Sequence, residues 1–329
     1  MDRPLDVRLS PAAAESAAGL ETVIALRTGR YRTWTILRRD PWFWLGAGIV
    51  AALVAAAVLA PVLAPHDPIH QYRVDGRTPQ GNPLGSTARF PLGTDLQARD
   101  YLSRLLFGAR TSLTIALIAN LASTTIGLAI GSVAAFAGSV RVRIPGTRRR
   151  ITVPVESLLM RFTDLALSFP VLLLAIALTA VVGASIELVV VIIASVLWAT
   201  TARIVYGRGL VLRDAPFVEA ARAVGVRRGR ILVRHILPHI LPLAVVYGAL
   251  GVAASVLFET TLSFLGSGVQ SPDFTWGTML ADHISYYRSD PRLVVLPGLA
   301  VTFTVLGFTL LGDSLRDALD PRARPGRLG

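Results

Sequence analysis

The sequence contains no lysine and no cysteine, and each absence excludes a class of site. A nucleotide-binding loop of the GxxxxGK[ST] type needs its lysine to reach the phosphates, so this chain cannot contain one. Without cysteine there are no disulfides and no cysteine-ligated zinc sites. All 33 basic residues are arginine, whose positions therefore report the whole distribution of positive side-chain charge.

Charged residues are also scarce. They form 16% of the chain, against ~25% in soluble domains, while 53% of the residues are hydrophobic. This balance is typical of a membrane protein. A net charge of +12 could suit a nucleic-acid-binding protein, but no basic polar face or nucleic-acid-binding motif is present. The arginines instead lie between hydrophobic runs, so we expect lipid, and no nucleic acid, around the chain.

Six runs have the length of ~20 mainly apolar residues that a membrane-spanning helix needs. They are 42–63, 111–137, 158–182, 186–206, 240–265 and 293–311. Only "GAS" separates the third run from the fourth, which predicts a tight hairpin between them. The first run is longer than the core of a signal peptide, and we expect an uncleaved anchor. The predicted fold class is an all-α polytopic membrane protein.

The arginines are distributed unevenly between the two sides of these runs. The N-terminal residues, the second-to-third and fourth-to-fifth connections and the C-terminal residues hold 23 arginines, whereas the alternate connections hold eight. Positive residues are retained in cytoplasmic loops. We therefore predict a multi-pass protein of the cytoplasmic membrane with both termini in the cytoplasm.

This topology divides the chain into five parts. Residues 1–41 form a cytoplasmic tail, in which "YRTWTILRRDPWFW" indicates either a short interfacial helix or a flexible basic flank before an aromatic belt. Residues 42–63 form the first transmembrane helix, and residues 64–110 form an extracytoplasmic loop without helical or strand periodicity. Residues 111–312 form a core of five helices that includes a cytoplasmic connection, 214–235. Residues 313–329 form a cytoplasmic tail.

The cytoplasmic connection has a local design of its own. Asp214 can cap a short helix that begins near Pro216, and Phe217, Ala221 and Val224 fall on one face of that helix. Gly225 ends it. A second short helix in "RRGRILVRHIL" leads back to the bilayer. We predict a helix–turn–helix that projects from the membrane, with a small apolar face that its own chain leaves uncovered. The alternative is an ordinary basic connection.

The stretch "EAARAVGVRRGRILVRHILPHILP" (219–242) resembles the EAA loop of ABC-importer membrane subunits, specifically those of the dipeptide/oligopeptide/nickel permease family. Glu219, Ala220, Ala221 and Gly225 match the motif. His239 stands where the family usually has asparagine.

The resemblance extends over about 91–322. "PLGTDLQARDYLSRLLFGARTSL", "RFTDLALSFP", "TTLSFLGSGVQSPDFTWGTML" and "PGLAVTFTVLGFTLLGDSLRDALDPR" resemble further segments of the family in the same order. Ala98 and Ser314 stand where glycine is more usual. Agreement in order and spacing is far more specific than any single motif.

The resemblance implies a type I ABC importer permease with six helices. It implies four further subunits: a second homologous permease, two cytoplasmic ATPases that bind ATP and Mg, and an extracytoplasmic substrate-binding protein. This chain would be a non-catalytic translocation subunit without a cofactor, and its 214–235 connection would form the coupling helices that dock into the ATPase. Di- or oligopeptides are the substrates we expect first, with nickel or another small solute as the alternative.

Two groups of charges inside the predicted helices bear on function. Arg161 and Asp164 are three residues apart near the cytoplasmic end of the third helix, so we expect a snorkelling or locally paired couple, with a functional role as the alternative. Glu259 in the fifth helix has no evident partner in its own helix. It could line the substrate path or pair with a partner subunit, because an unpaired carboxylate facing lipid is costly.

Before the second helix lie Asp95, Arg99 and Asp100, which we assign to local capping and ion pairing. Trp276 is expected at the outer interface as an aromatic anchor. His66, His70 and His283 have no spacing that suggests a metal site, and we expect surface histidines.

Two other classes of membrane protein would have different sequence features. A secondary transporter acting alone should have interrupted helices in both halves and charges at mid-membrane depth. A membrane-embedded enzyme should have convergent His, Asp, Glu or Ser groups within the helices. Neither pattern is present in the sequence.

Overall fold

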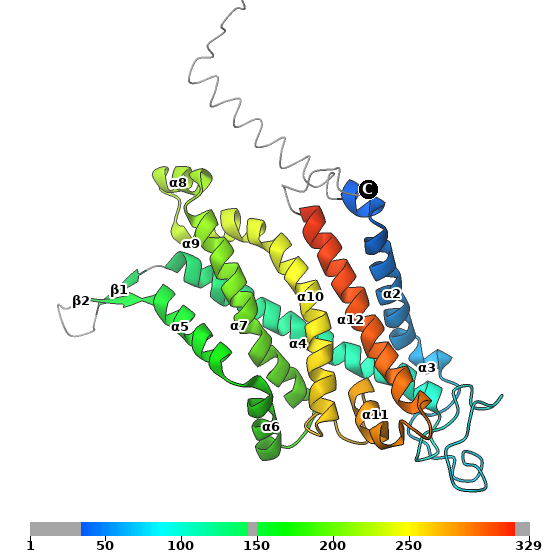
Figure 1. Ribbon diagram of the computed structural model, residues 1–329. Coiled ribbons are helices and arrows are strands. Elements are labelled where there is room, and N and C mark those ends of the chain that lie inside the picture. The colour runs from blue at the N-terminus through cyan, green and yellow to red at the C-terminus, as the bar shows by residue number, and fades with distance from the viewer. Residues whose placement is uncertain (1–33, 138, 144–149, 320–329) are drawn as a thin grey trace, which may run out of the picture.

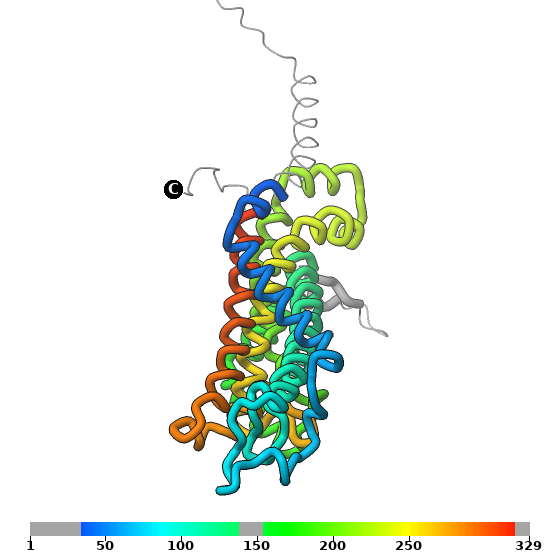
Figure 2. Tube along the Cα trace, turned by 90° about the vertical axis from the view of Figure 1, so that its right-hand side faces the viewer, coloured from blue at the N-terminus to red at the C-terminus, as the bar shows by residue number. Residues whose placement is uncertain are grey.

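The computed structural model describes residues 34–137, 139–143 and 150–319. Long helices lie side by side in an elongated bundle (Figures 1 and 2). One end, here called the arginine-rich end, holds the start of α2, the short helices α8 and α9 and the end of α12 (Figure 1). The other, here called the loop end, holds residues 64–100, α6 and α11.

Five helical segments in this part of the chain are long and apolar enough to span a membrane. They are α2 (Pro41–Val58), α4 (Tyr101–Ala137), α7 (Ile186–Arg213), α9 with α10 (Arg228–Phe264) and α12 (Arg292–Leu319). The helices α5 (Val155–Ser168) and α6 (Val171–Val182) meet at a bend of 80°, and they make a sixth if the pair is counted as one span. The all-α polytopic prediction is confirmed.

The predicted boundaries need correction in three places. Residues 101–110, predicted as loop, are the first turns of α4, and residues 313–319, predicted as tail, are the last turns of α12. The third run is not one straight helix. Pro170 disfavours helical geometry at Phe169, whose ψ is 136°, so α5 ends there and α6 starts in a new direction.

Several short elements complete the described chain. Residues 34–39, which precede α2, are helical, and α3 (Ala60–Leu63) follows α2. The strands β1 (Ser139–Arg143) and β2 (Arg150–Pro154) form an antiparallel hairpin that we did not predict. At the arginine-rich end are α8 (Pro216–Ala223), α9 (Arg228–Ile231) and a π-helical segment (Leu232–Ile236) that leads into α10 (Leu237–Phe264). At the loop end, α11 (Trp276–His283) continues as a 3₁₀ turn (Ile284–Tyr286).

Helices α4 and α7 pack closely because small residues lie between them. A Cβ atom on Gly131 would lie 2.4 Å from the Ala202 carbonyl oxygen, and one on Gly209 would lie 2.6 Å from the Ala135 Cβ. Small residues allow this approach where lipid supplies no hydrophobic driving force between helices. The two helices therefore form the rigid centre of the bundle.

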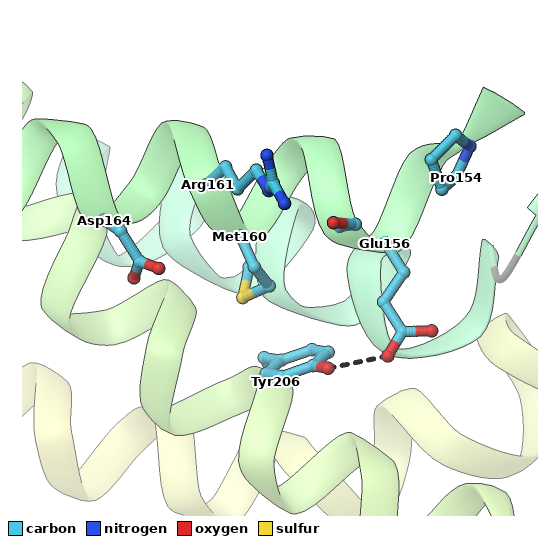
Figure 3. A pocket seen from close by; sticks show the side chains of 7 residues that line it. Pro154, Glu156, Met160, Arg161, Asp164 and Tyr206 are labelled. Atoms are coloured by element: carbon cyan, nitrogen blue, oxygen red, sulfur yellow. Dashed lines mark hydrogen bonds between the residues drawn. The ribbon is translucent and has the colours of Figure 1, made fainter.

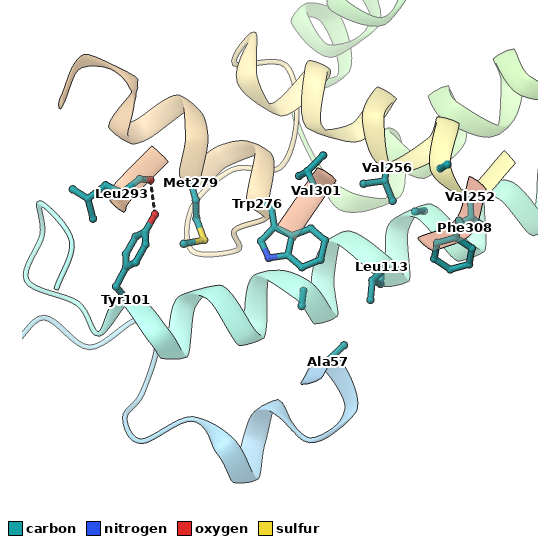
Figure 4. Packing of buried hydrophobic residues seen from close by; sticks show 13 residues of the cluster. Ala57, Tyr101, Leu113, Val252, Val256, Trp276, Met279, Leu293, Val301 and Phe308 are labelled. Atoms are coloured by element: carbon teal, nitrogen blue, oxygen red, sulfur yellow. Dashed lines mark hydrogen bonds between the residues drawn. The ribbon is translucent and has the colours of Figure 1, made fainter. Parts of the chain in front are cut away.

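A second core lies nearer the loop end, where α4, α10, α11 and α12 meet (Figure 4). The Tyr101 hydroxyl donates to the Leu293 carbonyl oxygen at 2.5 Å, which joins α4 to α12. Trp276 is buried with 1% exposure, and its indole N–H donates to the Leu105 carbonyl oxygen at 3.1 Å. The expected interfacial anchor is therefore wrong, because α11 folds back against α4 and encloses the ring.

Residues 64–100 are held against the start of α12 by one side chain. The Arg292 guanidinium donates to the carbonyl oxygens of Leu92 at 2.5 Å, Leu84 at 2.6 Å and Thr94 at 3.3 Å. Its Nε donates to Asp290 at 2.8 Å. The loop has no strand ladder of its own. The Arg292 guanidinium therefore donates hydrogen bonds to backbone carbonyl oxygens of the loop that a neighbouring strand would bind in a sheet.

Candidate functional site

The connection from α7 to α10 is built by local backbone preferences. Pro216 occupies the first helical position of α8, where its missing N–H costs nothing. Ala215 is the N-cap residue and no side chain caps the helix, so the capping role predicted for Asp214 is wrong. Asp214 instead ends α7 and lies 3.5 Å from the Arg213 Nε. Gly225, with φ of 79°, reverses the chain after α8.

Buried side chains fasten α8 to three of the long helices. Val218 is fully buried and Ala221 is 8% exposed. They belong to one apolar cluster, here called the α8 cluster, with Phe136 of α4, Val205 and Leu212 of α7, and Ile231, Ile236 and Ile240 on the way into α10. The buried side of α8 is therefore attached to the bundle through this cluster, which includes side chains of α4, α7 and the start of α10.

This packing corrects the predicted apolar face. Ala221 points into the α8 cluster, whereas Phe217 stacks on His239 with ring centroids 5.2 Å apart and Val224 is 79% exposed. Periodicity alone could not reveal this, because an alanine fits an inward or an outward face equally well. Four of the exposed residues, Glu219, Ala220, Ala223 and Val224, are here called the α8 surface.

The α8 surface is small and apolar apart from one carboxylate, and arginines surround it. Arg222, Arg227, Arg228 and Arg230 are exposed beside it. Arg222 donates to the Arg213 carbonyl oxygen at 3.2 Å and lies 5.8 Å from the Phe136 ring centroid, so part of this charge is used to hold α8 in place. Arginine is enriched at protein–protein interfaces, and the small alanine side chains leave room for another protein to approach the α8 backbone closely.

Comparison with known proteins assigns this chain to a family. The sequence pattern of the family described as "Binding-protein-dependent transport system inner membrane component" matches residues 127–325, which is more than half of the chain. The chain belongs to this family. The pattern of the "N-terminal TM domain of oligopeptide transport permease C" matches residues 31–79.

Curated relatives of this permease have similar lengths and about a third of the residues in common. The oligopeptide permease protein OppC of Haemophilus influenzae is 37% identical over 70% of each chain. The dipeptide permease protein DppC of Alkalihalophilus pseudofirmus is 35% identical over 75% of this chain and 76% of its own. The glutathione permease protein GsiD of Pectobacterium atrosepticum is 38% identical over 73% and 75%.

Membership establishes the class of this permease. It is a membrane-spanning subunit of a binding-protein-dependent transport system, and it is a multi-pass protein of the cytoplasmic membrane. The family resemblance predicted from the EAA-like stretch is confirmed.

Glu259 of the permease lies inside its own chain. It is fully buried on α10, where it accepts a hydrogen bond from Ser263 Oγ at 2.7 Å and one from Ser112 Oγ of α4 at 3.5 Å. Ser263 is one turn further along α10, so the expectation of no partner in its own helix is wrong. Neither a path-lining nor an intersubunit position agrees with this burial; Glu259 joins α10 to α4 beside the start of α11.

Asp164 of the permease has a partner other than the predicted one. Its carboxylate pairs with Arg203 of α7, not with Arg161. Arg161 has no acidic partner within ion-pair distance in the described part of the chain. The sequence spacing of three residues made Arg161 the nearest candidate along the helix, whereas the packing of α5 on α7 brings Arg203 closer.

Asp95, Arg99 and Asp100 form a buried polar group at the loop end. Asp95 accepts from the Arg99 Nε at 2.7 Å and from the backbone N–H of Arg99 at 2.9 Å, and the Arg104 Nε lies 3.4 Å away. Asp100 accepts from the backbone N–H and the hydroxyl of Ser103 at the start of α4. These contacts are local capping and ion pairing, and they shape the loop end without an open reactive group.

His283 is not the surface histidine that we expected. It is 1% exposed at the end of α11, and its Nδ1 lies 2.6 Å from the Met279 carbonyl oxygen. Burial lowers the pKa of this imidazole. No group of three or more metal-binding side chains is found in residues 34–137, 139–143 and 150–319.

Proposed function

We propose that this chain is one of two permease subunits of an ATP-driven importer and that its α8 surface receives the movement of a cytoplasmic ATPase. The observation that supports the proposal is the packing of α8 in the α8 cluster. Because Val218 and Ala221 pack against α4, α7 and the start of α10, a force applied to α8 acts on all three helices at once. A flexible basic connection would not transmit such a force.

The chain's own chemistry supports a division of labour between subunits. It has no lysine and hence no lysine-dependent phosphate loop, so ATP and Mg are bound by the partner ATPases. Closure of the two ATPases would push the two α8 surfaces and tilt α4, α7 and α10 around a path between this chain and a homologous subunit. A substrate-binding protein would deliver the solute at the loop end. The permease itself needs no cofactor and catalyses no reaction.

The substrate class proposed first is a short peptide. Relatives with 35–38% identity are named for oligopeptide, dipeptide and glutathione transport. All three substrates are peptide-like. Nickel, the alternative, has no counterpart among these names, and the permease offers no cluster of metal-binding side chains in its described part.

We further propose that the arginine-rich end is cytoplasmic. A cysteine in place of Arg227 should react with a membrane-impermeant thiol reagent only after the membrane is opened, whereas a cysteine in place of Asp75 should react in intact cells. Both side chains are exposed, and the native chain contributes no cysteine background. Reaction of the Asp75→Cys variant only in opened membranes contradicts this orientation.

The function itself is tested by reconstitution. The permease, a homologous subunit, two ATPases and a substrate-binding protein are placed together in proteoliposomes with a labelled tripeptide. We expect uptake that requires ATP and the binding protein, and none from the permease alone. Uptake by the isolated permease without ATP would identify a secondary transporter instead.

A further inference from the structure

Helix α5 carries a polar stripe along one side. Ser157, Arg161, Asp164 and Ser168 are spaced i, i+4, i+7 and i+11, which places them on one face. All four are exposed in the chain. These residues are here called the α5 stripe. The neighbouring face of α5 is apolar, and Leu158 and Leu165 on it are 53% and 57% exposed.

The stripe borders a pocket of about 410 Å³ between α5 and α7 (Figure 3). Six side chains shown in Figure 3 line it, together with Ser157: Pro154, Glu156, Met160, Arg161, Asp164 and Tyr206. α5 lies between β2 and α6 (Figure 1), and its Glu156 and Asp164 pair with Arg213 and Arg203 in the last turns of α7. The pocket therefore lies beside the end of α7 that leads into α8.

One of the charged side chains that line the pocket has no ion-pair partner among the described residues. Glu156 accepts a hydrogen bond from the Tyr206 hydroxyl at 2.7 Å and lies 3.4 Å from the Arg213 Nη1. Asp164 is paired with Arg203. Arg161 is the lining charge that has no acidic partner among the described residues, so the pocket presents one free guanidinium.

Such a charge is costly against lipid. Charged side chains within a membrane-spanning segment face the bundle interior or a water-filled cavity. The Asp164 and Arg203 side chains are each 57% exposed in this chain, which leaves the α5 stripe against water or against another subunit. A protein surface that covered it would need its own carboxylate for Arg161, whereas a water-filled path would not.

We propose that the α5 stripe lines a water-filled part of the substrate path and that Arg161 binds the free carboxylate of a peptide-like solute there. A guanidinium offers two parallel N–H donors that match a carboxylate. Arg203 holds Asp164 aside, so that this aspartate does not compete for Arg161. The inference rests on the proposed function, because it assigns a binding residue to the path of that importer.

Thiol accessibility tests the location. Ser157→Cys and Ser168→Cys are compared with Leu158→Cys and Leu165→Cys on the adjacent apolar face, each in the complete transporter in inside-out vesicles. We expect a charged, membrane-impermeant thiol reagent to modify the two stripe cysteines at least about tenfold faster than the two control cysteines. Equal rates on both faces overturn the proposal. Unreactive stripe cysteines also overturn it, and show that a second subunit covers this face.

Transport kinetics test the role of Arg161. For a tripeptide with a free carboxylate, Arg161→Gln should raise the KM of ATP-driven uptake about tenfold, while Arg161→Lys should raise it less. For the C-terminally amidated tripeptide, the unmodified transporter and the Arg161→Gln and Arg161→Lys variants should have the same KM.

These outcomes separate the two proposals. If the unmodified transporter shows no ATP-dependent uptake, the proposed function is wrong. If it transports both peptides and Arg161→Gln changes neither KM, only the role of the α5 stripe is wrong.

Discussion

Ala223→Trp is expected to abolish ATP-driven uptake while leaving the amount of permease in the membrane unchanged. Ala223 is exposed on the α8 surface and contacts no buried cluster of its own chain. An indole there would enlarge a surface that we propose lies in a closely packed groove of the ATPase. Overpacking costs ~1–3 kcal/mol, which corresponds to a loss of roughly five- to 150-fold in docking affinity.

Ala221→Trp is the informative comparison, because it adds the same ring two residues away on the opposite side of α8. Ala221 belongs to the α8 cluster, so the indole would be forced between α4, α7 and the start of α10. We expect less folded permease in the membrane for this variant. The two alanines thus separate a docking defect from a packing defect.

The measurements are permease abundance by immunoblot, co-purification of the ATPases and uptake in proteoliposomes. Ala51→Trp, an exposed alanine on α2, controls for the added ring. If Ala223→Trp retained ATPase binding and full uptake, the coupling role of the α8 surface would be wrong.

Glu259→Leu is expected to destabilise the permease more than any other single change at the loop end. The fully buried Glu259 carboxylate accepts from Ser263 Oγ and Ser112 Oγ, and Ser112 Oγ in turn accepts from the backbone N–H of Trp276 at 3.1 Å. Leucine would leave the two serine hydroxyls without their acceptor. Each buried polar group left unsatisfied costs ~1–3 kcal/mol.

Thermal unfolding of the purified permease in detergent measures this effect. We expect a clear decrease in unfolding temperature for Glu259→Leu and a much smaller one for Glu259→Gln, whose amide oxygen can still accept. Thr261→Leu, at an exposed position on the same helix, should change little. An unchanged unfolding temperature combined with lost uptake would indicate that Glu259 lines the substrate path.

The sequence predicted the membrane-spanning segments well, because the hydrophobic runs that cross a bilayer are long and local. It predicted the turn at Gly225 for a similar reason, since positive φ strongly favours glycine. The bend after α5 was also local in origin. Pro170 stood in the middle of an apolar run, and hydropathy alone could not show that it divides the run.

Errors at the candidate site had a different cause. Whether Ala221 points inward, whether Asp164 meets Arg161 or Arg203, and whether Trp276 is enclosed all depend on contacts between helices far apart in the sequence. Composition and periodicity describe one helix at a time. A buried carboxylate such as Glu259 was recognisable as unusual, but its serine on α4 lies 147 residues away along the chain.

The attachment of residues 64–100 to Arg292 has a consequence for how the protein is made. Arg292 reaches the Leu84 carbonyl oxygen across 208 residues, and the Tyr101 hydroxyl reaches Leu293 across 192. During synthesis the N-terminal anchor and this loop are therefore inserted long before the arginine that holds the loop leaves the ribosome. The loop end takes its final form only when the last helix arrives, so a chain interrupted before α12 would present an unfinished loop end to proteases.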